Sequence, residues 1–376
     1  GGFLANDRPI VAKYNGEIRW PAFRQIGESF GWVNAYGDLP GRTWRNAETD
    51  WAIWPPIPYA ASTIDSQAGK YVSPFQKQQV ESLGWRHWLG TDKFGRDVVA
   101  GLISGTRVAI LVGLVAMLIA LFIGLLIGGV SGYFGDDTLR WPRWRSLGLI
   151  VGLLGSLGYF TGSLWPFLQQ HSWFIQFVAS LFCLFICCVF FLGIFRLLSK
   201  GWPWLAQVRK VPLDALVLRM IELFNSIPGL VLLISLLAIL NRPTILTVMI
   251  VIGLIRWTGI ARFVRAELLR IRQLPYIEAA RVSGYSDVRI LVRHALPNAL
   301  GPVIIAVAFG VAGAVLLEAF LSFLGIGLPP DQVSWGSLLA QTRRQASAWW
   351  LAVFPGLAIF LTVLCLNVVG ESLRRA

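Results

Sequence analysis

Seven stretches of this 376-residue chain are apolar over about the 20 residues that an α-helix needs to cross a bilayer core. They lie near 106–130, 147–167, 173–198, 216–240, 244–262, 299–323 and 347–370. The chain is 55% hydrophobic and only 14% charged, whereas soluble domains average roughly 25% charged residues. The sequence therefore predicts an all-α polytopic membrane protein.

Basic residues gather in alternate connections between these runs. Segments 139–145, 196–210 and 262–293 and the C-terminal end carry most of them, and the loop with Arg343 and Arg344 is an exception. Because basic loops remain cytoplasmic, we expect a cytoplasmic C-terminus and an extracytoplasmic N-terminal region. The net charge of +13 follows from these loops, and no recognition motif indicates a nucleic-acid partner.

Residues 1–104 contain no spanning run and are rich in Trp, Pro and Gly. We expect a small extracytoplasmic domain or structured loop, whose Trp residues form a core or lie on the membrane surface. An external region with no anchor before it also predicts a membrane helix preceding Gly1 in the full protein.

The stretch "GTDKFGRD" lies just before the first run. Paired acids for catalysis would need a cleft facing a substrate, so we favour an ion-paired turn that holds the external region against the first span. Its residues are Gly90, Thr91, Asp92, Gly95, Arg96 and Asp97.

No sequence motif clearly indicates metal binding or nucleotide hydrolysis. The four cysteines lie inside apolar runs and read as small buried hydrophobes, and the three histidines are far apart in sequence. No G-x-x-x-x-G-K-[ST] loop cradles a phosphate. We expect no catalytic site, metal or cofactor in this chain.

The polar insert "YIEAARVSGYSDVRILVRHALPN" at 276–298 separates two apolar runs. Pro275 suits a first helical position, and Gly284 suits a helix end. Ser286 is a candidate N-cap for a second helix, which we expect Pro297 to end. The pattern predicts two short helices joined by a sharp bend on the cytoplasmic side.

Two readings of this insert remain open. Its alanines would let a partner protein approach, with Ile277 and Leu291 as apolar anchors in a partner's groove. Alternatively, Arg281, Arg289 and Arg293 would suit a helix that rests on lipid headgroups.

The insert resembles the "EAA" signature of ABC importer permeases. The matching residues are Glu278, Ala279, Ala280, Arg281, Gly284, Asp287, His294, Leu296 and Pro297. "RHALPN" is similar to the peptide and nickel branch, as are "LGTDKFGRDVVAGLISGTRVAI", "LEAFLSFLGIGLPP" with "SWG", and "LNVVGESLRRA". The N-terminal "ANDRPIVAKYNGEIRWP" further resembles the microcin C-type oligopeptide importer permeases.

This resemblance implies a type I importer transmembrane fold. The insert would be the coupling helix pair within a loop at 263–298, seated on a separate ATPase subunit that binds ATP and Mg. It also implies a second permease subunit, two ATPase subunits and an extracytoplasmic binding protein. The expected parts are 1–104 outside, a first core span at 105–135, an inserted two-helix hairpin at 136–213, which departs from the family pattern, and the remaining spans at 214–376.

Four further residues are candidates for lining or gating a pathway. Acidic groups within spans are costly and therefore often functional, but Glu222 can also reach water and Glu318 can bond a neighbouring helix. Asn225 and Pro228 should kink or unwind their span, either as pathway lining or as a tolerated bend.

The sequence indicates an oligopeptide or peptide-like cargo. Uptake of nickel or another metal complex is the alternative. A carrier or channel that works without ATP is less favoured, because neither internal repeats nor charges in the middle of a span stand out.

Overall fold

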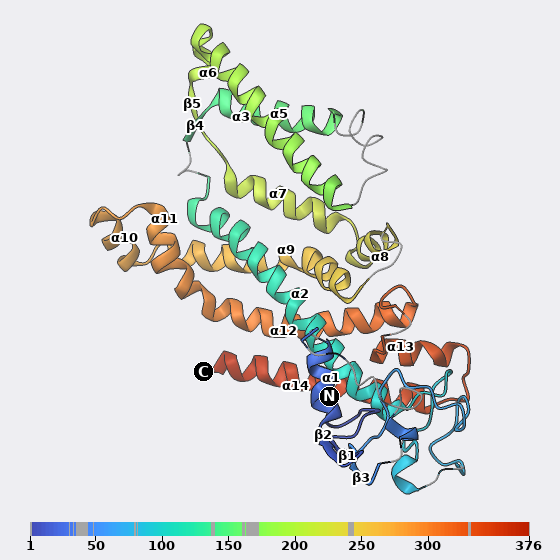
Figure 1. Cartoon of the computed structure of the whole chain (residues 1–376). Helices are drawn as coiled ribbons and strands as arrows, with labels where there is room; N and C mark the ends of the chain where they lie inside the picture. Colours follow the sequence, from blue (N-terminus) through green and yellow to red (C-terminus); the bar gives the residue numbers. More distant parts are fainter. Residues whose placement is uncertain are drawn as a thin grey trace. The chain divides into compact units, whose positions relative to one another are not determined.

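Most of the chain is helical in the computed structural model (Figure 1). The structure describes residues 2–29, 31, 32, 34, 44–47, 49–78, 80, 82–136, 140–159, 162, 173–239, 244–329 and 332–375. It divides into two compact units, one of residues 1–129 with 223–376 and one of residues 130–222.

The helices of the described residues are α1 (Pro21–Ser29), α2 (Val98–Phe134), α3 (Arg143–Tyr159), α5 (Trp173–Gly201), α6 (Pro203–Ala206), α7 (Leu213–Ser226), α8 (Gly229–Ile239), α9 (Ile245–Ile271), α10 (Pro275–Val282), α11 (Asp287–Ile290), α12 (Leu296–Leu324), α13 (Trp335–Leu339) and α14 (Trp350–Arg375). A π-helix at Leu291–Ala295 joins α11 to α12, and 3-10 helices lie at Trp44–Asn46, Leu83–Trp85 and Ala340–Arg343.

Five of the described helices are long and apolar enough to cross a membrane. They are α2, α5 over Val178–Gly201, α9, the continuous helix Asp287–Leu324, and α14. The pair α7 and α8, bent by 78°, makes a sixth if it is one span. The predicted helical membrane fold is confirmed. The expected run at 147–167 begins in α3, and most of its second half lies outside the described residues.

Small residues set how closely α2 and α9 pack. A Cβ on Gly124 would lie 2.7 Å from Ile260, and one on Gly128 would lie 2.4 Å from the carbonyl oxygen of Ala261. Gly253 of α9 approaches Ile119 in the same way, at 2.8 Å. The four-residue glycine spacing thus allows a close helix contact.

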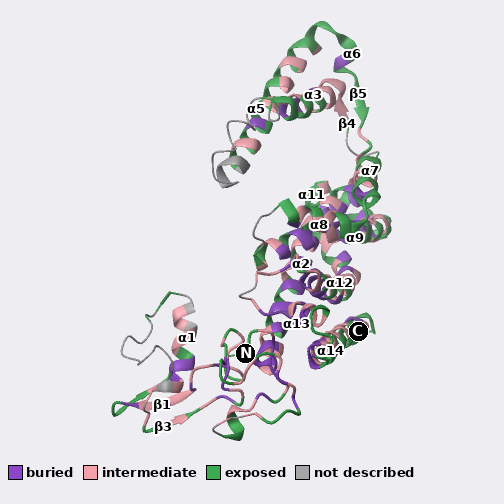
Figure 2. Cartoon of the chain, turned by 90° about the vertical axis from the view of Figure 1, so that its right-hand side faces the viewer, coloured by how far each residue is buried: buried purple, intermediate pink, exposed green. Residues whose placement is uncertain are grey.

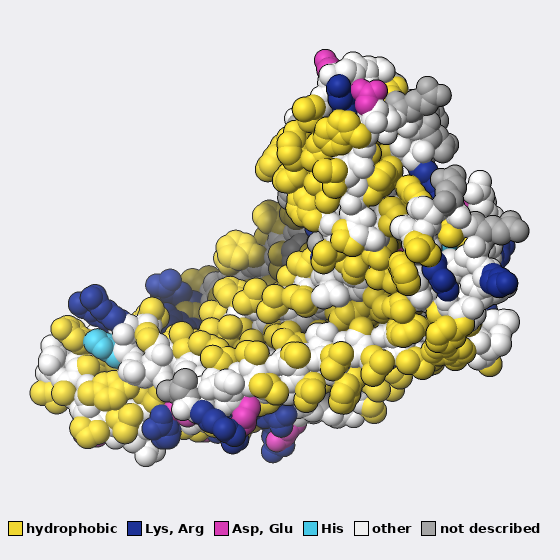
Figure 3. All heavy atoms as spheres, turned by 90° about the horizontal axis from the view of Figure 1, so that it is seen from below, with side chains coloured by type: hydrophobic (Ala, Val, Ile, Leu, Met, Phe, Trp, Pro, Cys, Tyr) yellow, Lys and Arg dark blue, Asp and Glu magenta, His cyan; other side chains and the backbone are white. Residues whose placement is uncertain are grey.

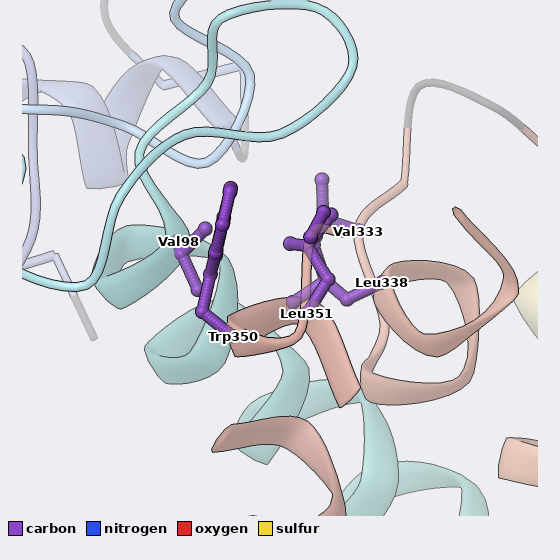
Figure 4. Packing of buried hydrophobic residues seen from close by; sticks show 6 residues of the cluster. Val98, Val333, Leu338, Trp350 and Leu351 are labelled. Carbon is purple, nitrogen blue, oxygen red and sulfur yellow. The ribbon is translucent and has the colours of Figure 1, made fainter. Parts of the chain in front are cut away.

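A compact apolar cluster joins the start of α2 to α13 and α14. Val98, Val333, Leu338, Trp350 and Leu351 are buried together (Figure 4). Buried positions also lie along α9 and α12, whereas α5 is largely exposed (Figure 2). Hydrophobic side chains cover much of the face seen in Figure 3, with Lys and Arg side chains near its margins. Exposed apolar helix faces are those expected to meet lipid.

The N-terminal region folds around a three-stranded antiparallel sheet. Its strands β1 (Val11–Tyr14), β2 (Glu17–Arg19) and β3 (Trp51–Ile53) stand in the order β2-β1-β3, with Ala12 opposite both Arg19 and Ala52. Trp44 packs on Ala12 and Tyr14 and is 3% exposed, but Trp32 is 77% exposed. The Trp residues therefore serve both as core and as surface.

The second unit contains the helix pair α3 and α5. A Cβ on Gly152 would lie 2.9 Å from the Cα of Cys188, so glycine permits close packing here as well. Strands β4 (Arg140–Pro142) and β5 (Val208–Lys210), which precede α3 and follow α6 in sequence, pair antiparallel. The two helices thus form a self-contained hairpin.

Candidate functional site

The polar insert forms a sharp bend after α10. Gly284 has φ +78°, its N–H donates to Arg281 O, and the Tyr285 N–H donates to Ala280 O. These two bonds make a Schellman motif, in which glycine avoids the strain of a left-handed backbone. The predicted helix end at Gly284 is confirmed. We call residues 275–298 the elbow.

The second helix of the elbow does not end at Pro297, and that prediction is wrong. α11, the π-helix and α12 run on as one helix from Asp287 to Leu324. Pro297 is in the first turn of α12, directly after the π-helix, whose wider turn can accommodate a ring without an N–H. Ser286 is the N-cap of α11, but its side chain makes no capping hydrogen bond.

The apolar anchors of the elbow are not the expected ones. Ile277 is fully buried and Leu291 is 7% exposed, so both pack within this chain. The most exposed apolar side chains are Val282 at 90%, Val288 at 63% and Val292 at 60%, while Tyr276 and Tyr285 are exposed at 40% and 42%. A partner at this surface would therefore contact mainly valines.

Aromatic and polar contacts hold the elbow's shape. The rings of Tyr285 and His294 stack with centroids 6.0 Å apart, and the Arg289 guanidinium lies 4.5 Å from the Tyr285 ring centroid. Asn298 Nδ2 donates to the Tyr276 hydroxyl at 3.1 Å and to His294 O at 2.7 Å. These contacts tie α10 to the start of α12.

The residues of the "EAA" signature divide between surface and interior. Glu278, Ala279, Arg281, Gly284 and Pro297 are exposed; Asp287, His294 and Leu296 are half-buried; Ala280 is buried. Arg281 Nε lies 4.0 Å from Asp287 Oδ1, an ion pair across the bend. Most of the signature thus lies on an accessible surface.

The turn at 90–97 is buried and held by hydrogen bonds. Asp92 Oδ1 accepts from the N–H groups of Phe94 and Arg96, and Trp350 Nε1 donates to Thr91 O. Asp97 contacts the ring of His87 at 2.8 Å. Asp92 and Asp97 thus bind backbone groups and a buried histidine.

Glycines allow the turn to approach its neighbours. Gly90 and Gly95 have φ near +80°, and a Cβ on Gly90 would lie 2.4 Å from Val72 O. Gln341, next to α13, accepts from the Lys93 N–H at 2.9 Å. The turn therefore joins the N-terminal region to the helices of the same unit.

The four pathway candidates are dispersed. Glu222 is exposed and forms an ion pair with Arg219 at 2.8 Å. Glu318 is 1% exposed and accepts from Ser322 Oγ at 2.7 Å. Asn225 accepts from Thr258 Oγ1 at 3.2 Å, next to Pro228, where the predicted break between α7 and α8 is confirmed.

One charged residue in a span was overlooked by the sequence reasoning. Arg256 is near the middle of α9 and lines a cavity of about 410 Å³ together with Asn225, Thr258 and Arg262. A single Arg in an otherwise apolar window is the signal that marks it. Among the described residues, no group of three or more His, Cys, Asp or Glu side chains could hold a metal ion.

The C-terminal part of the chain is similar to a known protein family. Residues 201–376, which include the elbow and this cavity, match the family described as "Binding-protein-dependent transport system inner membrane component". This match concerns the membrane-embedded permease component.

Relatives extend the similarity to the whole chain. The peptidoglycan transport system permease protein YejE of Agrobacterium fabrum is 28% identical, covering 100% of this chain and 84% of that protein. The inner membrane ABC transporter permease protein YejE of Escherichia coli is 27% identical, covering 99% and 86%. A "Putative peptide transport system permease protein" of Brucella suis is 43% identical over 43% of this chain and 54% of its own length.

Proposed function

We propose that this chain is a permease that imports peptides and couples to an ATPase through its elbow, starting from the match of residues 201–376 to the family of inner-membrane components of binding-protein-dependent transport systems. The chain is a multi-pass inner-membrane subunit, and the ATP-hydrolysing site belongs to other subunits of such a system.

The observation that carries the coupling role is the continuity of the elbow with a spanning helix. α11 is the first turn of a 38-residue helix that ends at Leu324. α10 follows α9 after a gap of three residues. A displacement of the elbow must therefore move two spanning helices, α9 and α12, which pack against one another.

The exposed valines supply the binding surface for the ATPase. Val282, Val288 and Val292 are uncovered on a short braced element, which is the form that suits a groove in a partner. ATP-driven closure of the partner would favour one of two packings of α9 and α12, because a bound partner shifts a two-state equilibrium only by its differential affinity.

Partners and orientation follow from the same proposal. The elbow and the end of α14 lie toward one end of their unit, and the N-terminal region lies toward the other (Figure 1). We assign the elbow and the C-terminus to the cytoplasm and residues 1–104 to the outside. A second permease subunit, two ATPase subunits and an external binding protein complete the transporter.

The cargo is assigned from the relatives. The Brucella relative is named for peptide transport and the Agrobacterium relative for peptidoglycan transport. Peptides, including the peptide parts of cell-wall fragments, are the class that the two names share. Nickel uptake has no comparable support among these relatives.

A photo-activated cross-linking amino acid at Val288 of the assembled transporter tests the coupling role. The expected result is a covalent product with the ATPase subunit, whose yield changes when ATP is added. The matched control is the same amino acid at Phe75, which is 82% exposed in the N-terminal region and should give no ATPase product.

Cross-links from Val288 to phospholipid alone would refute the coupling role and favour a helix that rests on headgroups. Uptake of a labelled peptide by this chain in vesicles without any ATPase would favour a carrier instead.

A further inference from the structure

Arg256 places a positive charge inside a membrane span. It is the twelfth residue of the 27-residue helix α9. A charged side chain at this depth is costly and usually faces protein or water-filled space. A charged residue in a span therefore suggests a functional role for its charge.

The fold makes room for this guanidinium and gives it no counter-charge. A Cβ on Gly313 of α12 would lie 2.6 Å from Arg256 Nη2, so glycine is what leaves the space. Arg256 Nε is buried without a hydrogen-bond partner among the described residues, and no described Asp or Glu lies within 4.0 Å of the guanidinium nitrogens. The guanidinium of Arg256 is therefore available to bind an anionic group that is not part of the described chain.

The cavity beside Arg256 is chemically suited to an anion. Its described lining includes a second cation, Arg262, and the polar pair Asn225 and Thr258, and it includes no acidic residue. Gly229 and Leu230, the first turn of α8, also line it. α8 starts at a break within the membrane region, and the N-terminus of such a half-helix carries partial positive charge.

We propose that Arg256 and the first turn of α8 bind a carboxylate of the peptide as it passes through the membrane. The inference rests on the proposed function and adds the charge selectivity of the path. A cavity of about 410 Å³ has room for more than one carboxylate, and its Asn and Thr groups can bond a peptide amide. These features favour cargo over a single acidic side chain of the second permease.

Uptake of two labelled tripeptides by the reconstituted transporter tests this proposal. One has a free C-terminal carboxylate and the other a C-terminal amide, and each is supplied at a concentration that saturates the binding protein. The wild-type complex should transport the free acid faster by about tenfold to a hundredfold, the range expected for hydrogen bonds to a charged group.

Three variants of the cavity and one control variant separate the effect of the charge from an effect on the fold. Arg256→Gln should bring the uptake ratio close to one, and Arg256→Lys should retain part of it. Gly313→Ala keeps the charge but displaces the guanidinium, and should lower the ratio. Arg196→Gln, which removes an exposed cation of α5 outside the cavity, should leave the ratio unchanged.

The proposal is overturned by a wild-type ratio near one, by an unchanged ratio in Arg256→Gln, or by an equal loss of both peptides. Loss of the second permease from the purified Arg256→Gln complex would also overturn it, because Arg256 would then hold that subunit. Failure of the wild-type complex to take up either peptide with ATP would instead refute the proposed function.

Discussion

The turn at 90–97 and the elbow at 275–298 have similar compositions and opposite environments. Both contain Gly at positive φ, Asp and Arg. In the turn Thr91, Asp92 and Asp97 are at most 2% exposed, whereas in the elbow Val282 and Val288 are 90% and 63% exposed. The turn buries its polar groups to join parts of one chain. The elbow leaves apolar groups uncovered, which suits a surface for another chain.

The two glycines offer the sharpest test of this contrast. Gly90 and Gly284 have φ of +81° and +78°, so alanine meets the same backbone strain of about 1–2 kcal/mol at each. At Gly90 the new Cβ also meets Val72 O at 2.4 Å, while nothing lies within 4 Å at Gly284. We expect Gly90→Ala to destabilise the chain by about 3 kcal/mol or more, because overpacking adds to strain. Thermal unfolding of the purified protein measures both, and equal shifts would contradict the contrast.

Replacing Asp97 in the turn and Asp287 in the elbow should give a smaller difference in the free energy of unfolding, again with the larger loss in the turn. Asp97 Oδ1 accepts from the Ala100 N–H at 2.7 Å and Asp97 Oδ2 contacts buried His87. Asp97→Ala should cost about 2–4 kcal/mol, from a lost helix cap and an unpaired buried ring. Asp287→Ala should cost less than about 1 kcal/mol, since the side chains of its ion pair with Arg281 are each 44% exposed and 4.0 Å apart.

Asp97→Asn is the matched control, because its amide oxygen can still cap α2. It should retain part of the stability that alanine loses. If Asp287→Ala proved as costly as Asp97→Ala, the elbow would have to be regarded as structural.

Local sequence signals predicted where the backbone bends or breaks. They predicted less well which side chains are buried. The break at Pro228 and the helix end at Gly284 each depend on a residue type with a restricted or unusual conformation. Their physical cause lies within a few residues of sequence. Patterns of this kind can be read without tertiary structure.

The wrong predictions have both distant and local causes. Ile277 and Leu291 are buried within the chain, and the spacing of apolar residues alone does not distinguish a buried apolar side chain from one that is exposed to a partner. Pro297 continues its helix because a π-turn precedes it. The single Arg in the apolar window of α9 was a readable signal, but the space that accepts the Arg256 side chain depends on Gly313, far along the chain.

An acidic substitution on the exposed valine face tests the partner side of the comparison. Val288→Glu should reduce retention of the ATPase on the purified permease about tenfold, since the loss of an anchoring contact costs more than 1 kcal/mol. The stability of the permease itself should not change, because Val288 packs little within the chain. Val208→Glu is the control, as Val208 is 61% exposed in β5. Equal retention of the ATPase in the two variants would exclude this face from the interface.

The smallest expected effect concerns acid stability near the buried turn. Burial would by itself raise the pKa of Asp65, but hydrogen bonds from Arg45 and from the N–H groups of Gln67 and Ala68 outweigh it and lower that pKa below 3.8. Because the folded pKa is depressed, ionised Asp65 stabilises the fold above the ordinary pKa, and this contribution fades as pH falls through the folded value. Asp65→Asn should therefore unfold at a lower temperature than wild type at neutral pH, with the gap closing below about pH 4. Asp50→Asn, whose carboxylate is 58% exposed beside Lys13, should show almost no gap at either pH. A gap for Asp65→Asn that stayed constant down to pH 3 would show that the carboxylate's charge contributes nothing to the turn, and that only its hydrogen-bonding shape does.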